Sequence, residues 1–276
     1  MNKGLKLANL PKEKTIKKRN NIVRMGTENN TKLSTTALKL YNFLYLAFQY
    51  HRETVEKYDY TISIKQTTIK DELKITNDHY GEIIINAFKE LVSRTVVINN
   101  FTNSDGYVVK THITSLLHSV SDTKSKEDNK TKIYLVKLDK TLFDEMMKKE
   151  AGYTDLLLSN IKPLRSPQQI RLYEHCKSYE AMTKSEVMTL DDLNKLFFTN
   201  FKHLSKVEEL INRSIKRINE DTDIEITYKK DKKNKTIQFF IKPKKQVNKK
   251  QREYAKNKKM EQEALIKNVL EKVKNK

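Results

Sequence analysis

Basic and hydroxyl side chains gather in residues 202–220, and their chemistry suits contact with nucleic acid. Lysine and arginine donate to the acceptor edge of guanine, whereas serine and histidine are less selective. When such a segment is a DNA-reading helix, its N-terminal part reaches the base edges. The candidates for base reading are therefore Lys202, His203, Ser205, Lys206 and Arg213.

A second group of cations suits phosphate. Two of them lie farther along the same segment, and five lysines crowd the turn at 229–235, where only Asp231 opposes them. Such crowding is electrostatically unfavourable without a nearby polyanion, although salt screens it. The phosphate-binding candidates are Lys216, Arg217, Lys229, Lys230, Lys232, Lys233 and Lys235. The alternative for both groups is a solvated basic surface of a lysine-rich protein.

The elements that must position these residues are predicted from periodicity over residues 166–243. SPQQIRLYEHCKSYEAM, MTLDDLNKLF and FKHLSKVEELINRSIKRINE have helical patterns, and DIEITYKK and TIQFFIKP alternate as strands around the lysine-rich turn. The third helix should bury one stripe, made of Leu204, Val207, Ile211, Ile215 and Ile218. Three helices followed by a hairpin are the order of a winged helix, which binds duplex DNA with a helix in the major groove and a basic wing.

Residues 33–150 predict another unit of the same type. It is called the first unit below because it precedes the unit at 166–243, which is called the second. Helical spacing over 34–52, with Ser34 or Thr35 as cap, is followed by a β-rich TISI at 61–64 and helices at 66–74 and from Asn77 or Asp78 to about Arg94. TVVI, YVVKTHITSLLHSV and KIYLVKL then read as three strands, and TLFDEMMKK as a closing helix. The DNA-reading helix of this unit, beginning near His79, is less basic than that of the second. The predicted fold class is therefore α+β, with two tandem winged-helix domains.

Charge divides the chain into a body and two basic tails. Of the net charge of +20, residues 1–32 carry +7 and residues 244–276 carry +8. We predict a flexible N-terminal arm at 1–32, a first domain at 33–150 for dimerisation and auxiliary DNA contact, a second at 151–245 for the main recognition, and a tail at 246–276. A helix at about 259–274 within that tail could pack on the body or bind a partner.

Composition excludes several classes of protein. A single cysteine, Cys176, rules out an internal disulfide and a cysteine-cluster zinc site, and its helical neighbours predict a buried thiol. No apolar run is long enough to span a membrane, and no secretory signal is present, so the chain reads as cytoplasmic. Abundant Lys, Asn and Ile with scarce Gly and Pro suggest an AT-rich bacterial genome.

No catalytic constellation is apparent. The five glycines are scattered, so a P-loop is disfavoured, and neither a His-x-His pair nor a His-x-x-Arg motif occurs. The paired carboxylates at 191–192 and 208–209 are sequence neighbours and point about 100° apart on a helix, which makes them poor metal clamps. His112 and His118 read as ordinary strand residues. We expect no enzyme activity, no cofactor and no metal.

The second unit resembles the iteron-binding replication initiator (Rep) proteins of theta-replicating plasmids. SPQQIRLYE is similar to the helix signature of that family, and FKHL followed by INRSIKRINEDTDIEI is similar to its recognition helix and wing strand. ISIKQTTIKDELK and AFKELVSRTVVI match the first unit more loosely. The resemblance covers roughly residues 33–243.

This resemblance implies a protein that binds direct repeats in origin DNA as a monomer, with the second domain making the main base contacts. It also implies dimers formed through the first domain that repress or restrain replication, and contacts with a host initiator and helicase. A winged-helix transcriptional repressor without an origin role is the alternative, and a nickase or recombinase is a third. The apolar hairpin at 107–120, with Val109, Ile113 and Leu117 on one face, is the expected dimer surface.

Overall fold

The computed structural model describes residues 15–19, 33–102, 107–124, 131–147 and 153–244. Most of the predicted N-terminal arm and the C-terminal tail, with its helix at about 259–274, lie outside the described residues. Among the helices that are described, none is both long and apolar enough to cross a membrane.

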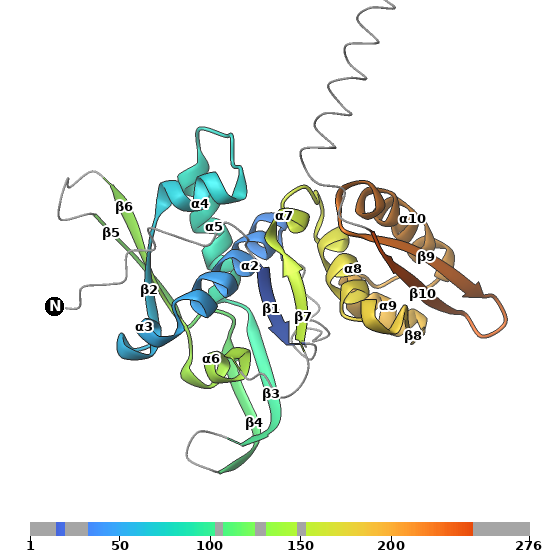
Figure 1. Ribbon diagram of the computed structural model, residues 1–276, viewed down its shortest axis with the longest axis horizontal. Coiled ribbons are helices and arrows are strands. Elements are labelled where there is room, and N and C mark those ends of the chain that lie inside the picture. The colour runs from blue at the N-terminus through green and yellow to red at the C-terminus, as the bar shows by residue number, and fades with distance from the viewer. Residues whose placement is uncertain (1–14, 20–32, 103–106, 125–130, 148–152, 245–276) are drawn as a thin grey trace, which may run out of the picture. The chain divides into compact units, whose positions relative to one another are not determined.

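The first unit begins with helices, as its periodicity predicts (Figure 1). Its helices are α2 (Thr35–Tyr50), α3 (Arg52–Lys57), α4 (Gln66–Leu73), α5 (Tyr80–Val92) and α6 (Lys140–Met147). Ser34 caps α2, because its side chain accepts from the Ala37 amide, so the first of the two predicted caps is the one used. Helices α2, α4 and α5 contact one another and enclose the core of this unit.

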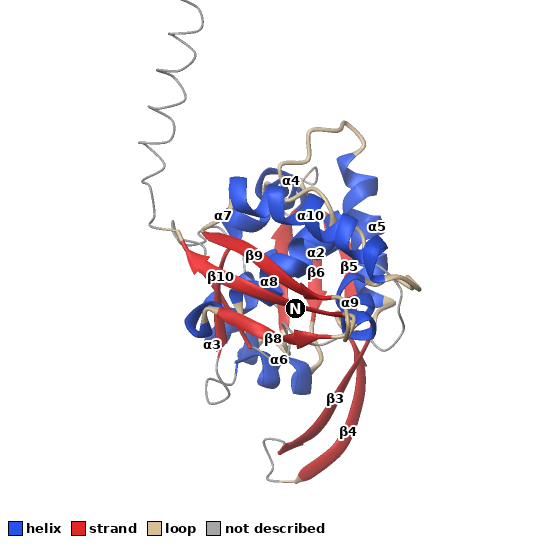
Figure 2. Cartoon of the chain, turned by 90° about the vertical axis from the view of Figure 1, so that its right-hand side faces the viewer, coloured by secondary structure: helices blue, strands red, loops and turns tan. Residues whose placement is uncertain are grey.

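Two antiparallel sheets accompany these helices. The strands are β2 (Thr61–Lys65), β3 (Thr95–Thr102), β4 (Val108–Ser115), β5 (Ser119–Lys124) and β6 (Lys132–Lys137). One sheet has the order β2-β6-β5, and β3 pairs with β4 in a hairpin that projects away from the helices (Figure 2).

The predicted strand over YVVKTHITSLLHSV is wrong in one respect, because the chain breaks at Leu116–His118. Leu116 and Leu117 turn into the core, and the halves on either side join different sheets. Leu117 is fully buried whereas Ile113 is 66% exposed. Val109, Ile113 and Leu117 therefore do not share one exposed face, contrary to the prediction.

A strand inside the predicted arm corrects that assignment for residues 15–19. Strand β1 (Thr15–Arg19) pairs antiparallel with β7 (Tyr153–Leu157), and the two lie side by side in Figure 1. Ile16 is fully buried, and the backbone of Lys17 exchanges two hydrogen bonds with the side chain of Gln49 on α2. The basic composition of 1–32 hid a strand whose alternate residues are buried.

The second unit has the predicted helices and hairpin plus one further strand. Its elements are α7 (Leu158–Ile161), α8 (Pro167–Lys177), a short 3-10 turn (Glu180–Met182), β8 (Lys184–Met188), α9 (Leu190–Phe197), α10 (Leu204–Asp221), β9 (Ile224–Asp231) and β10 (Thr236–Pro243). The sheet order is β8-β10-β9, so β8 completes the three-stranded sheet of a winged helix. The sequence did not indicate β8, because only Ser185 and Met188 of its five residues are buried.

Polar contacts tie the two units together at the connector between them. Lys162 forms an ion pair of 2.8 Å with Glu72 on α4, and its carbonyl accepts from the ammonium group of Lys39 on α2. Lys18 on β1 and Glu174 on α8 form a buried ion pair. The apolar core is continuous between the units as well, and it includes the buried thiol of Cys176 as predicted.

Candidate nucleic-acid interface

Helices α9 and α10 form a helix-turn-helix whose turn is organised by one side chain. The amide group of Asn194 donates to the carbonyl of Phe201 at 3.0 Å, and its oxygen accepts from the Phe201 amide at 3.0 Å and the Thr199 hydroxyl at 2.9 Å. Phe198 ends α9 in the left-handed conformation, at φ 53°. Asn194 thus fixes the path of the chain into α10, and sequence periodicity alone did not single it out.

The base-reading candidates lie at the start of α10 and on its exposed face. Lys202 and His203 immediately precede the helix, with His203 at the N-cap, and the other three are helical; all five are exposed. The buried side of the helix is close to the prediction, except that Ser214 is buried where Ile215 was expected. Ser214 tolerates burial because its hydroxyl donates to the Leu210 carbonyl at 2.8 Å.

Local contacts leave the basic groups of this face accessible. Lys206 lies 3.2 Å from Glu209, but both side chains are more than half exposed, so the pair contributes little and separates easily. The Nε of Arg213 donates to the Glu209 carbonyl at 3.2 Å, and the residue is exposed. This arrangement presents two cations, seven residues or about two helical turns apart, on the exposed side of α10.

The phosphate candidates fall into two sets. Lys216, Lys229, Lys232, Lys233 and Lys235 are exposed and form no ion pair with another described residue. Arg217 instead pairs with Asp221 and Glu220 in the last turn of α10, and Lys230 pairs with Glu208. The structure thus separates these two cations from the group that the sequence placed together.

The wing is defined here as residues 224–243, and its tip as residues 229–235. The tip is a tight turn built around Asp231. Its carboxylate accepts from the amides of Lys233 and Asn234 and from the Asn234 side chain, at 2.8–3.1 Å. The hydrogen bonds from Asn234 and Lys233 lower the pKa of Asp231, with a smaller effect from Lys229. The one acidic residue of the tip therefore shapes the turn that displays the lysines.

Polar side chains also join α10 to the first wing strand. The hydroxyl of Tyr228 lies 2.9 Å from Asn212 Oδ1 and 3.1 Å from Glu208 Oε1. The Lys230 ammonium lowers the pKa of Glu208, and desolvation raises the pKa of Tyr228. Sequence periodicity marked neither Glu208 nor Tyr228, because nothing local shows that β9 returns across α10.

The first unit offers a weaker surface of the same kind. Helix α5 begins at Tyr80, and His79 occupies the N-cap without a side-chain cap bond; the side chain of Asn77 instead accepts from the His79 amide at 2.7 Å. Lys70 of α4 lies over the Tyr80 ring, 4.4 Å from its centroid. Glu82 is exposed in the first turn of α5, which agrees with the expectation of a less basic helix.

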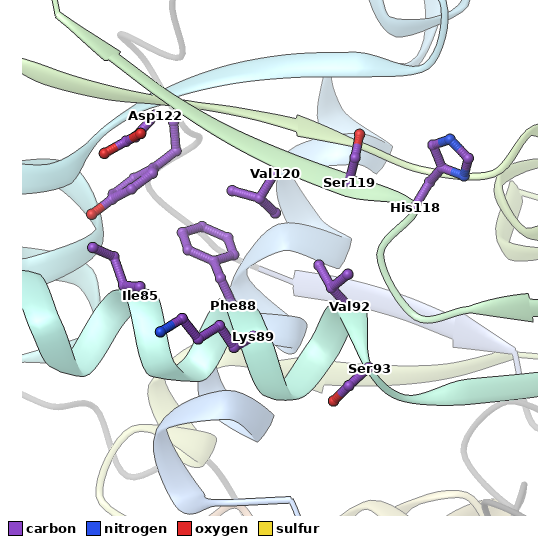
Figure 3. A pocket seen from close by; sticks show the side chains of 10 residues that line it. Ile85, Phe88, Lys89, Val92, Ser93, His118, Ser119, Val120 and Asp122 are labelled. Atoms are coloured by element: carbon purple, nitrogen blue, oxygen red, sulfur yellow. The ribbon is translucent and has the colours of Figure 1, made fainter.

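A groove of about 510 Å³ lies between α5 and the edge strand β5 (Figure 3). Phe88 and Val92 of α5 face Val120 of β5 across it, so its lining is largely apolar. At one end Asp122 pairs with Lys132 at 2.9 Å, and the hydrogen bond from Lys132 lowers the pKa of Asp122. All the residues that line the groove belong to the first unit.

Clusters of three or more His, Cys, Asp or Glu side chains that could hold a metal ion do not occur among the described residues. His112 lies 3.0 Å from Asp139 and joins β4 to the start of α6. His118 lies in the break between β4 and β5, where its amide donates to the Lys137 carbonyl.

A solved structure has a similar fold. A crystal structure of the Pi initiator protein in complex with iteron DNA aligns with a TM-score of 0.57 at 14% identity, over 84% of this chain and 98% of that one. Two structures of RctB domains 2 and 3 align with TM-scores of 0.46 and 0.42 at 14% and 12% identity, over 75% and 77% of this chain and 80% and 82% of theirs. At 14% identity, the likeness to the Pi initiator protein concerns the fold alone. No curated protein matches the chain in sequence.

The family itself is established by sequence. The match begins at the first residue of β1 and ends at the last residue of α8, so it spans the first unit and its junction with the second. The family model described as "Initiator Replication protein, WH1" matches residues 15–177, more than half of the chain, and the chain therefore belongs to that family.

Proposed function

We propose that this protein is a plasmid replication initiator that binds direct repeats in origin duplex DNA and promotes opening of the origin. The observation that carries the proposal is the joint presentation of an exposed basic face on α10 and a lysine-rich wing beside it. A helix of this kind suits the major groove, and the wing suits the adjacent backbone. The protein of similar fold is itself bound to iteron DNA, which supports repeats as the target.

In this proposal the second domain, residues 151–245, makes the main base contacts and the first, residues 33–150, makes auxiliary ones. Base reading is assigned to Lys202, His203, Ser205, Lys206 and Arg213. Phosphate contact is assigned to Lys216, Lys229, Lys232, Lys233 and Lys235. Membership of an initiator family favours this function over a repressor without an origin role.

We further propose that a homodimer forms through the first domain and restrains initiation. The support is strand β4, where Val108 and Ile113 are 77% and 66% exposed and which pairs only with β3 among the described strands. Exposed apolar residues on an unpaired strand edge favour pairing with another strand. Contacts with the host initiator and helicase belong to the same proposal, as does action on origin DNA in the bacterial cytoplasm.

The proposed role needs no intrinsic catalysis. Purified protein should neither hydrolyse ATP nor nick supercoiled DNA in the presence of a divalent metal. Cleavage that disappears when a single tyrosine is replaced by phenylalanine would contradict this proposal and indicate a covalent nicking mechanism.

Protection mapping on the DNA that flanks the gene tests the proposed function. We expect footprints at regular spacing over direct repeats beside an AT-rich tract, and permanganate reactivity in that tract when the protein is bound. The control is a fragment in which the repeats are scrambled at constant composition. Protection of a single inverted operator, without distortion of an AT-rich tract, would instead identify a repressor.

A further inference from the structure

Helix α10 and wing strand β9 are connected at two levels. Near the base, the side chain of Asn219 donates to the Ile226 carbonyl at 2.9 Å and accepts from the Ile226 amide at 2.7 Å. Farther out, Tyr228 and Lys230 reach Glu208, and Tyr228 also reaches Asn212. These three strand residues alternate, so they lie on the face of β9 that meets the helix.

Glu208 places a negative charge on the helix that we propose to bind DNA. It lies on the recognition helix between Lys206 and Arg213, where a carboxylate repels phosphate. It also holds the ammonium group of Lys230, whose side chain is 23% exposed, in an ion pair. Affinity for any DNA sequence grows with the number of cations that neutralise phosphates, so both effects of Glu208 lower nonspecific binding.

The same carboxylate stabilises the geometry of the wing. With its two oxygens it contacts two residues of β9, and both partners would separate from the helix if the wing swung outward. Phosphate contacts set the register and orientation of a protein on the duplex, and base contacts then supply specificity. A wing held at a fixed angle to α10 therefore restricts how the helix can enter the major groove while the wing contacts the DNA backbone.

We propose that Glu208 is a specificity-determining positioning residue of the recognition helix. Through Tyr228 and Lys230 it fixes the wing against α10, and it withholds Lys230 from general phosphate binding. The fixed wing geometry raises affinity for cognate DNA, whereas affinity for random DNA falls because Lys230 is not available to bind phosphate. The inference rests on the proposed function, since it requires that α10 and the wing bind duplex DNA together.

The neighbouring carboxylate provides a matched control. Glu209 lies on the same helix, is 58% exposed and pairs with Lys206. Among the described residues its side chain has no hydrogen bond or ion pair with the wing. Glu208→Gln and Glu209→Gln remove the same charge from adjacent positions. Tyr228→Phe removes a hydroxyl from the wing contact and changes no charge.

The experiment measures affinities of the full chain for one cognate repeat and for random duplex of equal length, across a salt series. Both glutamine variants should bind random DNA more tightly than wild type, because a carboxylate is lost. Only Glu208→Gln and Tyr228→Phe should lower the ratio of cognate to random affinity, by about three- to tenfold, the size of one net hydrogen bond. For random DNA, Glu208→Gln should also steepen the slope of log affinity against log salt concentration, by up to about 0.9. Adding Lys230→Met to that variant should reverse the change in slope.

The outcomes separate this inference from the function on which it rests. If wild type does not distinguish the repeat from random DNA, the proposed function fails first. If wild type does distinguish them and Glu208→Gln has the same ratio as Glu209→Gln, the positioning role is overturned while the function stands. Tyr228→Phe keeps the test valid if a charge change disturbs folding, and an unchanged ratio in that variant also counts against the inference.

Discussion

The ammonium group of Lys18 lies 3.0 Å from Oε1 of Glu174, and both side chains are almost completely buried although 156 residues separate them. Asn42 donates to the same oxygen at 2.9 Å, and Arg171 lies 3.6 Å from the other carboxylate oxygen. The cluster joins β1, α2 and α8, and so connects the N-terminal strand and the first unit to helix α8 of the second unit. Burial lowers the pKa of Lys18, and Glu174 opposes that shift.

Replacing Glu174 should destabilise the protein more than replacing Lys18. Glu174→Gln leaves two buried cations without their anion, and loss of one partner from a buried pair costs about 3–5 kcal/mol. Lys18→Met leaves Glu174 with Arg171 and Asn42, so its cost should be smaller. Urea unfolding of both variants checks the order. Equal effects, or a larger loss for Lys18→Met, would contradict this account of the cluster.

Alanine substitution on the exposed face of α10 should separate base reading from phosphate contact. Lys206→Ala or Arg213→Ala should weaken binding to the cognate repeat by about 1–3 kcal/mol and relax specificity at one base position. Lys216→Ala, the control on the same helix, should weaken cognate and random DNA alike. The measurement is the affinity of each protein variant for a set of DNA repeats that each carry one altered base pair. Wild-type affinity in both test variants would exclude them as base readers.

Neutralising the tip of the wing should reduce nonspecific affinity. Changing Lys232, Lys233 and Lys235 to glutamine should weaken the binding of cognate and random DNA alike. It should also flatten the slope of log affinity against log salt concentration, by about one unit for each lost phosphate contact. Exposed lysines elsewhere provide a control with the same loss of charge: Lys57, Lys110 and Lys184. The slope from fluorescence anisotropy over a salt series is the readout. An unchanged slope for the tip variant would show that its lysines are only solvated.

A charge at Ile113 should shift the protein from dimer to monomer. Ile113 is 66% exposed on β4, so Ile113→Glu leaves the core intact while opposing strand pairing. Direct-repeat binding should rise and inverted-repeat binding should fall, because a two-fold dimer suits inverted sites. Leu117 is unsuitable for this test because it is fully buried, and a charge there would unfold the domain.

Sedimentation over a range of concentrations measures the change, and Ser121→Glu on exposed β5 is the matched control. A folded Ile113→Glu variant that is still dimeric would place the interface elsewhere. A wild type that is monomeric at every concentration would refute the switch.

The thiol of Cys176 should be inert in the folded protein and should make stability fall at alkaline pH. Burial raises the pKa of this thiol well above its usual range. The folded state therefore keeps a proton that the unfolded chain loses as pH rises above about 8.5, so the free energy of unfolding decreases there by at most about 1.4 kcal/mol per pH unit. Wild type should lose stability more steeply than Cys176→Ala between pH 8.5 and 10. Rapid reaction of native protein with a thiol reagent, or equal slopes, would contradict this.

Local pattern determined the helices, the wing and the identity of the basic candidates. The three- and four-residue spacing of Leu204, Val207, Ile211 and Ile218 predicted which side of α10 is buried, and the opposite side follows from helical geometry alone. The burial of Cys176 was predicted in the same way, and Ser34 was one of the two caps predicted for α2. These features depend on residues within one or two turns of each other, so the sequence contains all of their causes.

Tertiary structure decided everything that depends on distant residues. Strand β1 was hidden in a basic segment because its partner strand is far away in sequence: the paired residues are 142 positions apart at Thr15↔Leu157 and 134 apart at Arg19↔Tyr153. The break at Leu117 depends on a core that the strand pattern does not reveal. Above all, the ion pairs of Lys230 with Glu208 and of Lys18 with Glu174 arise only when β9 folds back on α10 and β1 approaches α8. Charge can be counted along a chain, but which charges neutralise each other is a property of their distances in space.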